Sequence, residues 1–182
     1  MIDFDRNKEN DMILPLEYFR ASAVELAPDL VGKLLCRSVD GEVHRLRILE
    51  TECYYGEEDT ACHAHKGRTP RTDVMYGQGG RAYVYLCYGI HNLLNLTTGP
   101  EGHPEAVLIR GVEGAMGPGR VTKRASVDRS LNRSLLIPEN GLWIEDDGFV
   151  SKIDVFPRVG IGYASQEDQD KLWRFTVKTD LS

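Results

Sequence analysis

Apolar and polar residues alternate along residues 33–39 and 42–53, and this period of two predicts a pair of β-strands. Asp40-Gly41 lies between them and is a strong signal for a tight hairpin, because such a turn needs a positive φ. The second strand carries the candidate chemistry. Its period predicts four side chains on one face: Leu46, Ile48, Glu50 and Glu52.

The rest of the pattern predicts short elements. Ser22-Ala23-Val24-Glu25 has the form of a capping box that opens a helix. Residues 56–81 show little periodicity, and a loop of that length in a compact domain is usually functional or disordered. An aromatic strand over residues 82–88 ends at Gly89, and residues 91–97 follow. We further expect a strand at 106–110, a polar helix over 120–134, and closing strands at 142–145, 159–163 and 172–178.

These elements predict an α+β fold: a single compact domain with a mostly antiparallel curved sheet and flanking short helices. A length of 182 residues fits one domain with a sizeable core. We expect this domain over residues 15–182, after a flexible polar tail at residues 1–14. That tail is unlike a signal or transit peptide, and no apolar run approaches the roughly 20 residues of a membrane helix. We therefore expect a cytoplasmic protein that does not enter a membrane.

The cysteines, Cys36, Cys53, Cys62 and Cys87, are expected to be reduced, as is usual in the cytoplasm. Cys53, Cys62, His63 and His65 raise the question of zinc, but they lack the closely spaced cysteine pairs of structural zinc sites. We expect no metal.

The net charge is -6, which by itself argues against a nucleic-acid partner. Basic residues nevertheless dominate between residues 66 and 133, and a polyanion senses the local patch because screening acts over about 10 Å at 0.1 M salt. Charge alone leaves two interpretations open: a patch that binds a polyanion, or an ordinary solvated surface.

Glu52 is the strongest candidate for chemistry. Tyr54 faces the same side if the strand continues, and Glu50 shares that side. Two carboxylates suggest a glycosidase pair, but residues two apart on a strand lie about 7 Å apart and project side by side. We therefore expect one working carboxylate, Glu52, next to the long loop.

Histidine and tyrosine side chains follow this carboxylate. His63 is either functional or a loop histidine bonded to a backbone carbonyl. Tyr83 and Tyr85 share one face of their strand, where a core role and a stacking platform are both open. Tyr88 precedes Gly89 at a turn, and an exposed tyrosine there is poorly explained by core packing.

Several segments, in order and at matching separations, resemble the alkyladenine (3-methyladenine) DNA glycosylase family over residues 26–178. The residues that carry the resemblance are Asp29-Leu30-Val31-Gly32-Lys33-Leu34-Leu35, Glu50-Thr51-Glu52-Cys53-Tyr54, Gly56-Glu57-Glu58-Asp59, Ala61-Cys62-His63, Thr69-Pro70-Arg71, Met75-Tyr76, Ala82-Tyr83-Val84-Tyr85-Leu86-Cys87-Tyr88-Gly89, Asn95, Ala106-Val107-Leu108-Ile109-Arg110, Gly117-Pro118-Gly119-Arg120 and Pro157-Arg158-Val159-Gly160-Ile161.

The resemblance implies a monofunctional enzyme that flips a damaged purine out of double-stranded DNA and hydrolyses its N-glycosidic bond, without a cofactor and as a monomer. It implies Glu52 as the general base and Arg110 as a group that helps to hold the catalytic water or the backbone. It also implies that Tyr54, His63 and Tyr85 sandwich the base, that Asn95 filters purines, and that Tyr88 is the wedge. The basic residues Arg120, Lys123 and Arg124 suit phosphates.

The chain departs from the family at a few positions. His91 and Asn92 follow the wedge where apolar or aromatic residues are common, and Cys53 and Cys62 replace small residues such as Ala. Two rival functions stay open: a non-catalytic nucleic-acid-binding module that uses tyrosine stacking, and a small-sugar glycosidase. A carboxylate in a phosphate-binding groove argues against the first, and a single working carboxylate argues against the second.

Overall fold

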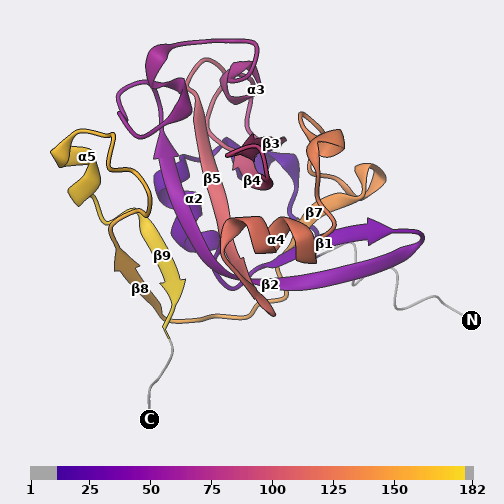
Figure 1. The fold of residues 1–182 in the computed structure, drawn as a ribbon. Helices are drawn as coiled ribbons and strands as arrows, with labels where there is room; N and C mark the ends of the chain where they lie inside the picture. The colour runs from indigo at the N-terminus through magenta and orange to yellow at the C-terminus, as the bar shows by residue number, and fades with distance from the viewer. Residues whose placement is uncertain (1–11, 179–182) are drawn as a thin grey trace, which may run out of the picture.

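The computed structural model describes residues 12–178, and these fold around a nine-stranded sheet in which the paired strands run antiparallel (Figure 1). The main strand order is β3-β4-β5-β2-β1-β7; β6 pairs with β5, and β9 pairs with both β2 and β8. The expected α+β fold is confirmed. The strands are β1 (Leu34–Val39), β2 (Glu42–Tyr55), β3 (Ala82–Cys87), β4 (His91–Thr97), β5 (Glu105–Val112), β6 (Ala115–Met116), β7 (Leu142–Glu145), β8 (Ile153–Phe156) and β9 (Arg174–Val177).

The helices are short. The α-helices are α2 (Ala23–Leu30), α3 (Asp73–Tyr76), α4 (Pro118–Arg124) and α5 (Gln166–Asp170), and the 3₁₀ turns are η1 (Leu16–Arg20), η2 (His63–Lys66), η3 (Arg129–Leu131) and η4 (Pro138–Asn140). Ser22 caps α2 as predicted, because its side chain accepts a hydrogen bond from the Val24 N–H. The buried face of α2 packs on β2 and β5 and forms part of the main apolar core.

The strand β2 connects the sheet. It begins in the predicted hairpin, where Asp40 and Gly41 have φ values of 50° and 82°, and then pairs in turn with β1, β5 and β9. Figure 1 shows β2 running from this hairpin to the loop that precedes α3. The end of β2 therefore delivers its side chains to the region where the long loop begins.

A change of face in the middle of β2 decides which side chains enter the core. The β2–β5 register shifts on either side of Glu50. Leu46 and Ile48 belong to the main core, but the next residue of β2 in that core is Cys53. The prediction that Leu46, Ile48, Glu50 and Glu52 share one face is therefore wrong. A bulge reverses the alternation, so that Glu50 and Glu52 lie opposite the apolar core.

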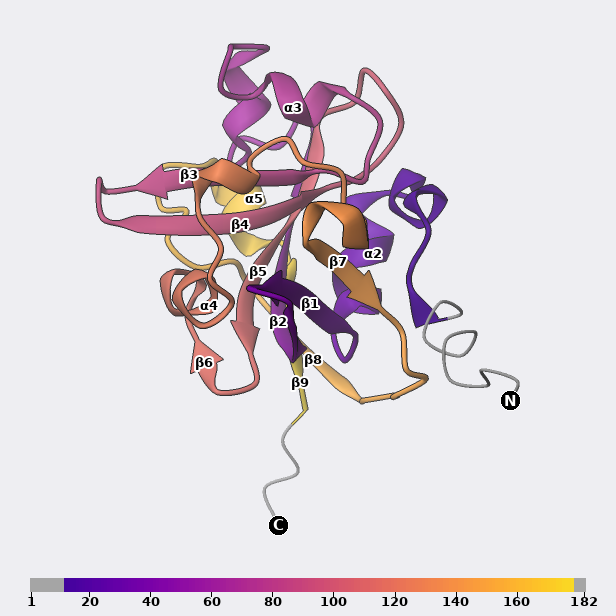
Figure 2. The same ribbon diagram turned by 90° about the vertical axis from the view of Figure 1, so that its right-hand side faces the viewer.

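The β3–β4 hairpin projects from the body of the molecule, with α4 beside it (Figure 2). The helix α4 packs on β4 and β5. On the other side of the hairpin, the segment after α4 covers the edge of β3: Arg133 N–H donates to Ala82 O, and Val84 N–H donates to the Asn132 side chain. This cover satisfies backbone groups that would otherwise be unpaired along the edge of β3.

The predicted helix over residues 120–134 is wrong in extent. It ends at Arg124, and Ser126 has a φ of 51°, a left-handed conformation that a helix cannot continue through. Asp128 then caps the separate turn η3 by accepting a hydrogen bond from Ser130 N–H. The burial of Val127 and Leu131 favours this break, because both side chains reach the main core from a bent segment.

The predicted closing strand at residues 159–163 is also wrong, because β8 lies earlier and residues 159–163 form a loop. The N–H of Val159 bonds a carboxylate instead of a strand, and Gly160 has a φ of 74°. The predicted strands at 142–145 and 172–178 are confirmed as β7 and β9, within one or two residues. The long loop at 56–81 contains only the short elements η2 and α3.

Of the expected tail at residues 1–14, residues 1–11 lie outside the described residues. Ile13 forms a β-bridge with Glu145, and Leu14 N–H donates to Ile144 O, so this part of the chain lies against β7. Within residues 12–178, none of the helices has the length and apolar character needed to cross a membrane.

Candidate active site

A pocket of about 430 Å³ lies among the β3–β4 hairpin, β5, the loop after β2 and the loop after β8. Five tyrosines and one histidine line it, together with aliphatic side chains, two cysteines, one amide and two arginines. The structure brings six of the predicted site residues to this pocket: Tyr54, His63, Tyr85, Tyr88, Asn95 and Arg110. The predicted general base and the predicted phosphate-binding residues lie elsewhere, as described below.

Glu52 lies behind the pocket wall. Its side chain is 0% exposed, and it does not itself line the cavity. The Tyr54 hydroxyl donates to Glu52 Oε2 at 2.8 Å, and the Val159 N–H donates to Glu52 Oε1 at 2.7 Å. Both donors line the pocket. Two residues of the pocket wall therefore bind the carboxylate.

Arg110 sets the charge around the two carboxylates of β2. Its Nε lies 3.3 Å from Glu50 Oε1 and 3.6 Å from Glu52 Oε1, and Arg174 Nη1 lies 3.1 Å from Glu50 Oε1. Glu50 is thus held by two arginines, whereas Glu52 shares only Arg110. The two carboxylates therefore have different charge environments.

Burial raises the pKa of Glu52, and the charge of Arg110 and the two hydrogen bonds from Val159 and Tyr54 oppose this effect. The pKa nevertheless remains above its usual value. A carboxyl group with a raised pKa accepts a proton more readily near neutral pH, and this is the property that a general base requires.

An aromatic wall forms one side of the pocket. The His63 and Tyr85 ring centroids lie 4.5 Å apart, and those of Tyr83 and Tyr85 lie 5.2 Å apart. His63 Nδ1 lies 3.0 Å from the Tyr83 hydroxyl. Burial, together with the charge of Arg71, lowers the pKa of His63 to about 4, so this imidazole is neutral at physiological pH. The wall therefore offers π faces without a positive charge on His63.

Asn95 and Arg71 bring polar groups to the same cavity. Asn95 is buried on β4 opposite Tyr83, and its Nδ2 donates to Tyr83 O at 3.3 Å. The Arg71 guanidinium lies over the Tyr85 ring, 5.0 Å from its centroid. An amide and a guanidinium beside aromatic rings can recognise the polar edge of a flat heterocycle.

The tip of the β3–β4 hairpin is apolar and exposed. Tyr88 is 92% exposed and has a φ of 51°, Gly89 has a φ of 70°, and Ile90 is 71% exposed. A tyrosine that is held in a strained backbone conformation and points into solvent contributes nothing to the core. The tip therefore presents a large ring at the pocket's rim.

The three basic residues predicted to bind phosphates, Arg120, Lys123 and Arg124, are exposed on α4. They do not line the pocket, but Pro118 at the start of α4 does. The helix packs on β4, which forms half of the projecting hairpin (Figure 2). The basic side chains consequently lie on the element next to the pocket rim.

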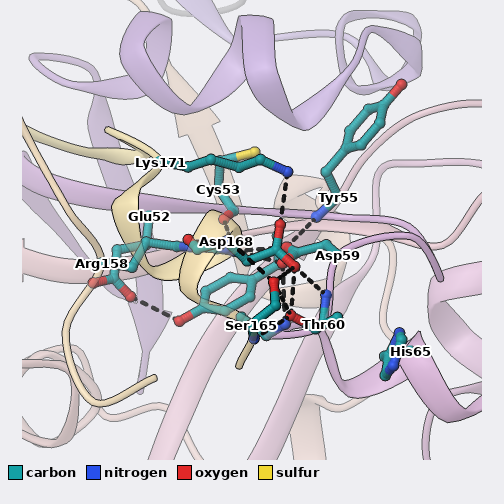
Figure 3. Close-up of polar contacts among 12 residues, drawn as sticks. Glu52, Cys53, Tyr55, Asp59, Thr60, His65, Arg158, Ser165, Asp168 and Lys171 are labelled. Atoms are coloured by element: carbon teal, nitrogen blue, oxygen red, sulfur yellow. Dashed lines mark hydrogen bonds and ion pairs between the residues drawn. The ribbon is translucent and has the colours of Figure 1, made fainter. Parts of the chain in front are cut away.

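A buried ion pair supports the loops around Glu52. Arg158 binds Asp59 with both terminal nitrogens, at 2.6 Å and 2.9 Å, and neither side chain is exposed. Figure 3 shows this pair beside the cluster that surrounds Asp168, whose carboxylate accepts hydrogen bonds from Thr60, Ser165 and Lys171. Together they tie the loop after β2 to α5.

His103 also holds the loop after β2, through contacts with two carboxylates. His103 Nε2 lies 2.9 Å from Glu58 Oε1, and its Nδ1 lies 2.9 Å from Glu105 Oε2. Burial by itself would lower the pKa of His103, but the hydrogen bonds to Glu105 and Glu58 prevail and raise it above its usual value. The imidazole therefore links the loop after β2 to the start of β5.

This tie predicts a pH-dependent stability. Because the pKa of His103 is raised on folding, its contribution is fully present below the unfolded value of about 6.5 and is lost as the pH rises through the folded value. We expect His103→Gln to lower the melting temperature more at about pH 6 than at about pH 9. The control is His44→Gln at an exposed position of β2, which should have little effect on the melting temperature. If His103→Gln lowers the melting temperature equally at both pH values, the contacts of His103 with Glu58 and Glu105 do not depend on a charge on its ring.

Sequence reasoning missed several pocket residues and their supports, namely Arg71, Val159, Tyr163 and the Asp59–Arg158 pair. Asp59 and Arg158 are 99 positions apart, and neither spacing nor periodicity indicated that they meet. Tyr163 donates its hydroxyl to Ala61 O at 2.8 Å. The only available signal was that these residues lie within or next to segments that resemble a known family.

The fold and the site define a class: an α+β domain with a tyrosine-rich pocket backed by a buried carboxylate. The comparisons with known proteins give the family. The sequence profile of the family described as methylpurine-DNA glycosylase matches residues 17–116 and 113–181. The chain belongs to the methylpurine-DNA glycosylase family of DNA repair glycosylases, and the resemblance found in the sequence is confirmed.

Similar proteins carry the name "Putative 3-methyladenine DNA glycosylase". One from Psychrobacter cryohalolentis is 43% identical over 185 residues, covering 85% of this chain and 87% of the relative. One from Methanocella arvoryzae is 43% identical over 186 residues, covering 91% and 92%. One from Natranaerobius thermophilus is 38% identical over 191 residues, covering 92% and 96%. The similarity therefore extends over nearly the whole length of both chains.

Proposed function

We propose that this protein is a monofunctional DNA N-glycosylase that extrudes a damaged purine from duplex DNA and hydrolyses its N-glycosidic bond, leaving an abasic site. The observation that carries the proposal is the buried Glu52 carboxylate directly behind an aromatic pocket, bonded by Tyr54 and Val159 from the pocket wall. The family membership and the names of the similar proteins support the same reaction.

The extruded base would lie between Tyr54 and the wall formed by His63 and Tyr85. The His63 and Tyr85 ring centroids are only 4.5 Å apart, with the ring planes at 60°, so the base would not fit between these two rings and would stack on a face that they turn to the cavity. A purine alkylated on its ring carries positive charge, and cation–π attraction to such faces contributes roughly 0.5–2 kcal/mol. A neutral His63 avoids repelling that charge. Asn95 faces the same cavity and would filter purines at their polar edge.

The attacking water must reach Glu52. Both carboxylate oxygens already accept one hydrogen bond each, from Val159 and Tyr54. An ionised carboxylate has about four acceptor sites, so a water can bind without displacing either donor. Arg110 lies at 3.6 Å from Glu52 and lines the pocket, so it would help to hold this water. Glu52 then accepts the proton of the water as it attacks the sugar.

Tyr88 and α4 would act on the duplex itself. Extrusion of a base costs a few kcal/mol, least for a damaged base, and an inserted ring compensates for lost stacking. Tyr88 is the exposed ring at the tip of the hairpin. Arg120, Lys123 and Arg124 on the neighbouring helix would bind backbone phosphates, despite the negative net charge of the whole chain.

A non-catalytic module that binds nucleic acid by tyrosine stacking is the alternative. The pocket rings alone would serve it equally well, but the buried Glu52 would not. Burial of a carboxylate beside a groove for a polyanion has an energetic cost that binding does not offset. The burial of Glu52 next to the pocket is explained if this carboxylate takes part in the reaction.

The test is a reaction with defined products. With duplex DNA methylated by dimethyl sulfate, we expect release of free methylpurine and an abasic strand that stays intact until alkali is added. Borohydride should trap no covalent complex, because no lysine lines the pocket formed by the described residues and no Schiff base is required. Binding without release of base would favour the alternative, and a trapped complex would show a lysine nucleophile and a lyase activity.

A further inference from the structure

The end of β2 is held from behind by Arg158. Its Nη1 donates to the carbonyl of Cys53, the residue between Glu52 and Tyr54, at 2.9 Å. Its guanidinium carbon lies 5.0 Å from the centroid of the Tyr54 ring. The residue that follows it, Val159, supplies the N–H that binds Glu52. Arg158 therefore contacts or adjoins both groups that donate hydrogen bonds to the proposed general base.

Asp59 fixes Arg158 in this position. The bidentate contact, 2.6 Å and 2.9 Å, leaves the guanidinium little freedom to rotate, because a planar fork matches a carboxylate in one orientation. Asp59 is itself held by the N–H groups of Tyr55 and Ala61 at 3.0 Å and 3.1 Å. Asp59 therefore links the loop after β2 to the peptide between Arg158 and Val159, although Asp59 and Arg158 are 99 residues apart in the sequence.

Stability alone explains the pair poorly. A buried ion pair often contributes no more stability than apolar side chains of similar volume. The Arg158 Nε is also buried and has no hydrogen-bond partner among the described residues, which adds to the energetic cost. A buried polar group without a partner, next to the pocket, needs an explanation other than stability.

We propose that Asp59 and Arg158 form a positioning pair that holds the Val159 N–H and the Tyr54 ring against Glu52, so that the general base keeps both hydrogen bonds and its orientation. The inference rests on the proposed function of Glu52. The pair touches neither the substrate nor the attacking water; its effect passes through the two donors of Glu52. The other titratable and charged groups that act on Glu52 are Arg110 on β5, Glu50 on β2 and Tyr163 in the loop after β8, and none of them belongs to the pair.

The test is the pH dependence of single-turnover excision from methylated duplex DNA by Asp59→Asn. Both donors lower the pKa of Glu52, so their loss raises it and moves the acid limb of the rate profile to higher pH. We expect a rate loss of about tenfold or more near pH 6 that shrinks to about threefold or less near pH 9, since one pKa unit corresponds to a factor of ten. Binding to a duplex with a tetrahydrofuran abasic analogue should stay within about twofold of the wild type.

Arg158→Lys provides a second variant if Asp59→Asn does not fold. A lysine keeps the charge and a contact to Asp59, but it lacks the fork that also reaches the Cys53 carbonyl. We expect a smaller shift of the acid limb in the same direction. The matched control is Glu145→Gln, which breaks another buried carboxylate–arginine contact, with Arg45 at 2.7 Å, away from the pocket. It should lower stability and leave the pH profile unchanged.

Two results overturn the inference in different ways. If Glu52→Gln excises at the wild-type rate, the proposed function of Glu52 fails, and the positioning role fails with it. If Glu52→Gln is inactive while the folded Asp59→Asn and Arg158→Lys variants keep the wild-type pH profile, only the positioning role fails. A loss of rate by the same factor at every pH has the second meaning, because it reports a structural effect and not a change in the ionisation of Glu52.

Discussion

Glu52→Gln should reduce base excision by a factor of about 10² or more, because an amide keeps the shape of the side chain but cannot accept a proton from water. The measurement is single-turnover release of methylpurine from methylated duplex DNA. Binding to lesion-bearing DNA should be retained, since the side chain is fully buried and does not line the pocket. The loss should therefore appear in the rate constant and not in the affinity.

The same variant should not lose stability above neutral pH. An acid with a pKa raised by folding weakens the folded state as the pH rises through that value, and a neutral amide removes this effect. Val159 N–H can still donate to the amide oxygen, and the Tyr54 hydroxyl can accept from the amide nitrogen. We expect a melting temperature at about pH 8 that is equal to or above that of the wild type.

Glu50→Gln is the matched control, because it removes a carboxylate two residues away that Arg110 and Arg174 already neutralise. Its effect on the excision rate should be less than about tenfold. If Glu50→Gln lowers the excision rate as much as Glu52→Gln does, the loss of rate reflects the net charge of the site. If Glu52→Gln is fully active, Glu52 is not the general base.

Tyr88→Ala should lower excision from duplex DNA by about 10- to 100-fold, since an inserted ring replaces stacking worth roughly 1–3 kcal/mol. The side chain is 92% exposed at a turn tip, so its removal should not unfold the protein. Affinity for a duplex that already lacks the base should change much less, because no base has to be extruded. The measurement compares binding to lesion and abasic duplexes; equal losses on both would mean that Tyr88 is a general contact and not a wedge.

Lys123→Ala and Arg124→Ala test the proposed phosphate contacts, and their expected effects differ from those of Tyr88→Ala. Each should weaken binding to damaged and undamaged duplex alike and reduce the slope of log affinity against log salt by about 0.9 for each lost phosphate contact. Tyr88→Ala should leave this slope unchanged. An unchanged slope for both basic variants would remove α4 from the DNA interface.

Much of the scaffold follows from local sequence. Asp40-Gly41 produced its hairpin because these residues adopt positive φ values at low cost, and Ser22 capped α2 because its hydroxyl accepts a backbone N–H. The aromatic strand β3 and the closing strands β7 and β9 also matched their patterns. Family resemblance, carried by ordered segments, supplied six residues that the structure places around one pocket.

Tertiary structure decided the rest. The bulge in β2 turned Glu50 and Glu52 away from the core, although strict alternation had placed them with Ile48. Ser126 ended α4 because buried Val127 and Leu131 pack from a bent segment, although no glycine or proline marked the break. The loop at Val159 bonds Glu52 instead of extending a strand.

The sequence by itself determined the β1–β2 hairpin, the cap of α2 and the types of side chain at the site, because φ preferences and alternation act over a few residues. Which residues support Glu52 was decided only when β2, the loop after it and the loop after β8 packed together. Asp59 and Arg158 meet across 99 residues, and their contact depends on the positions of three separate segments. Local propensity carries no information about such contacts, since their free energy arises only when the folded chain excludes water from between them.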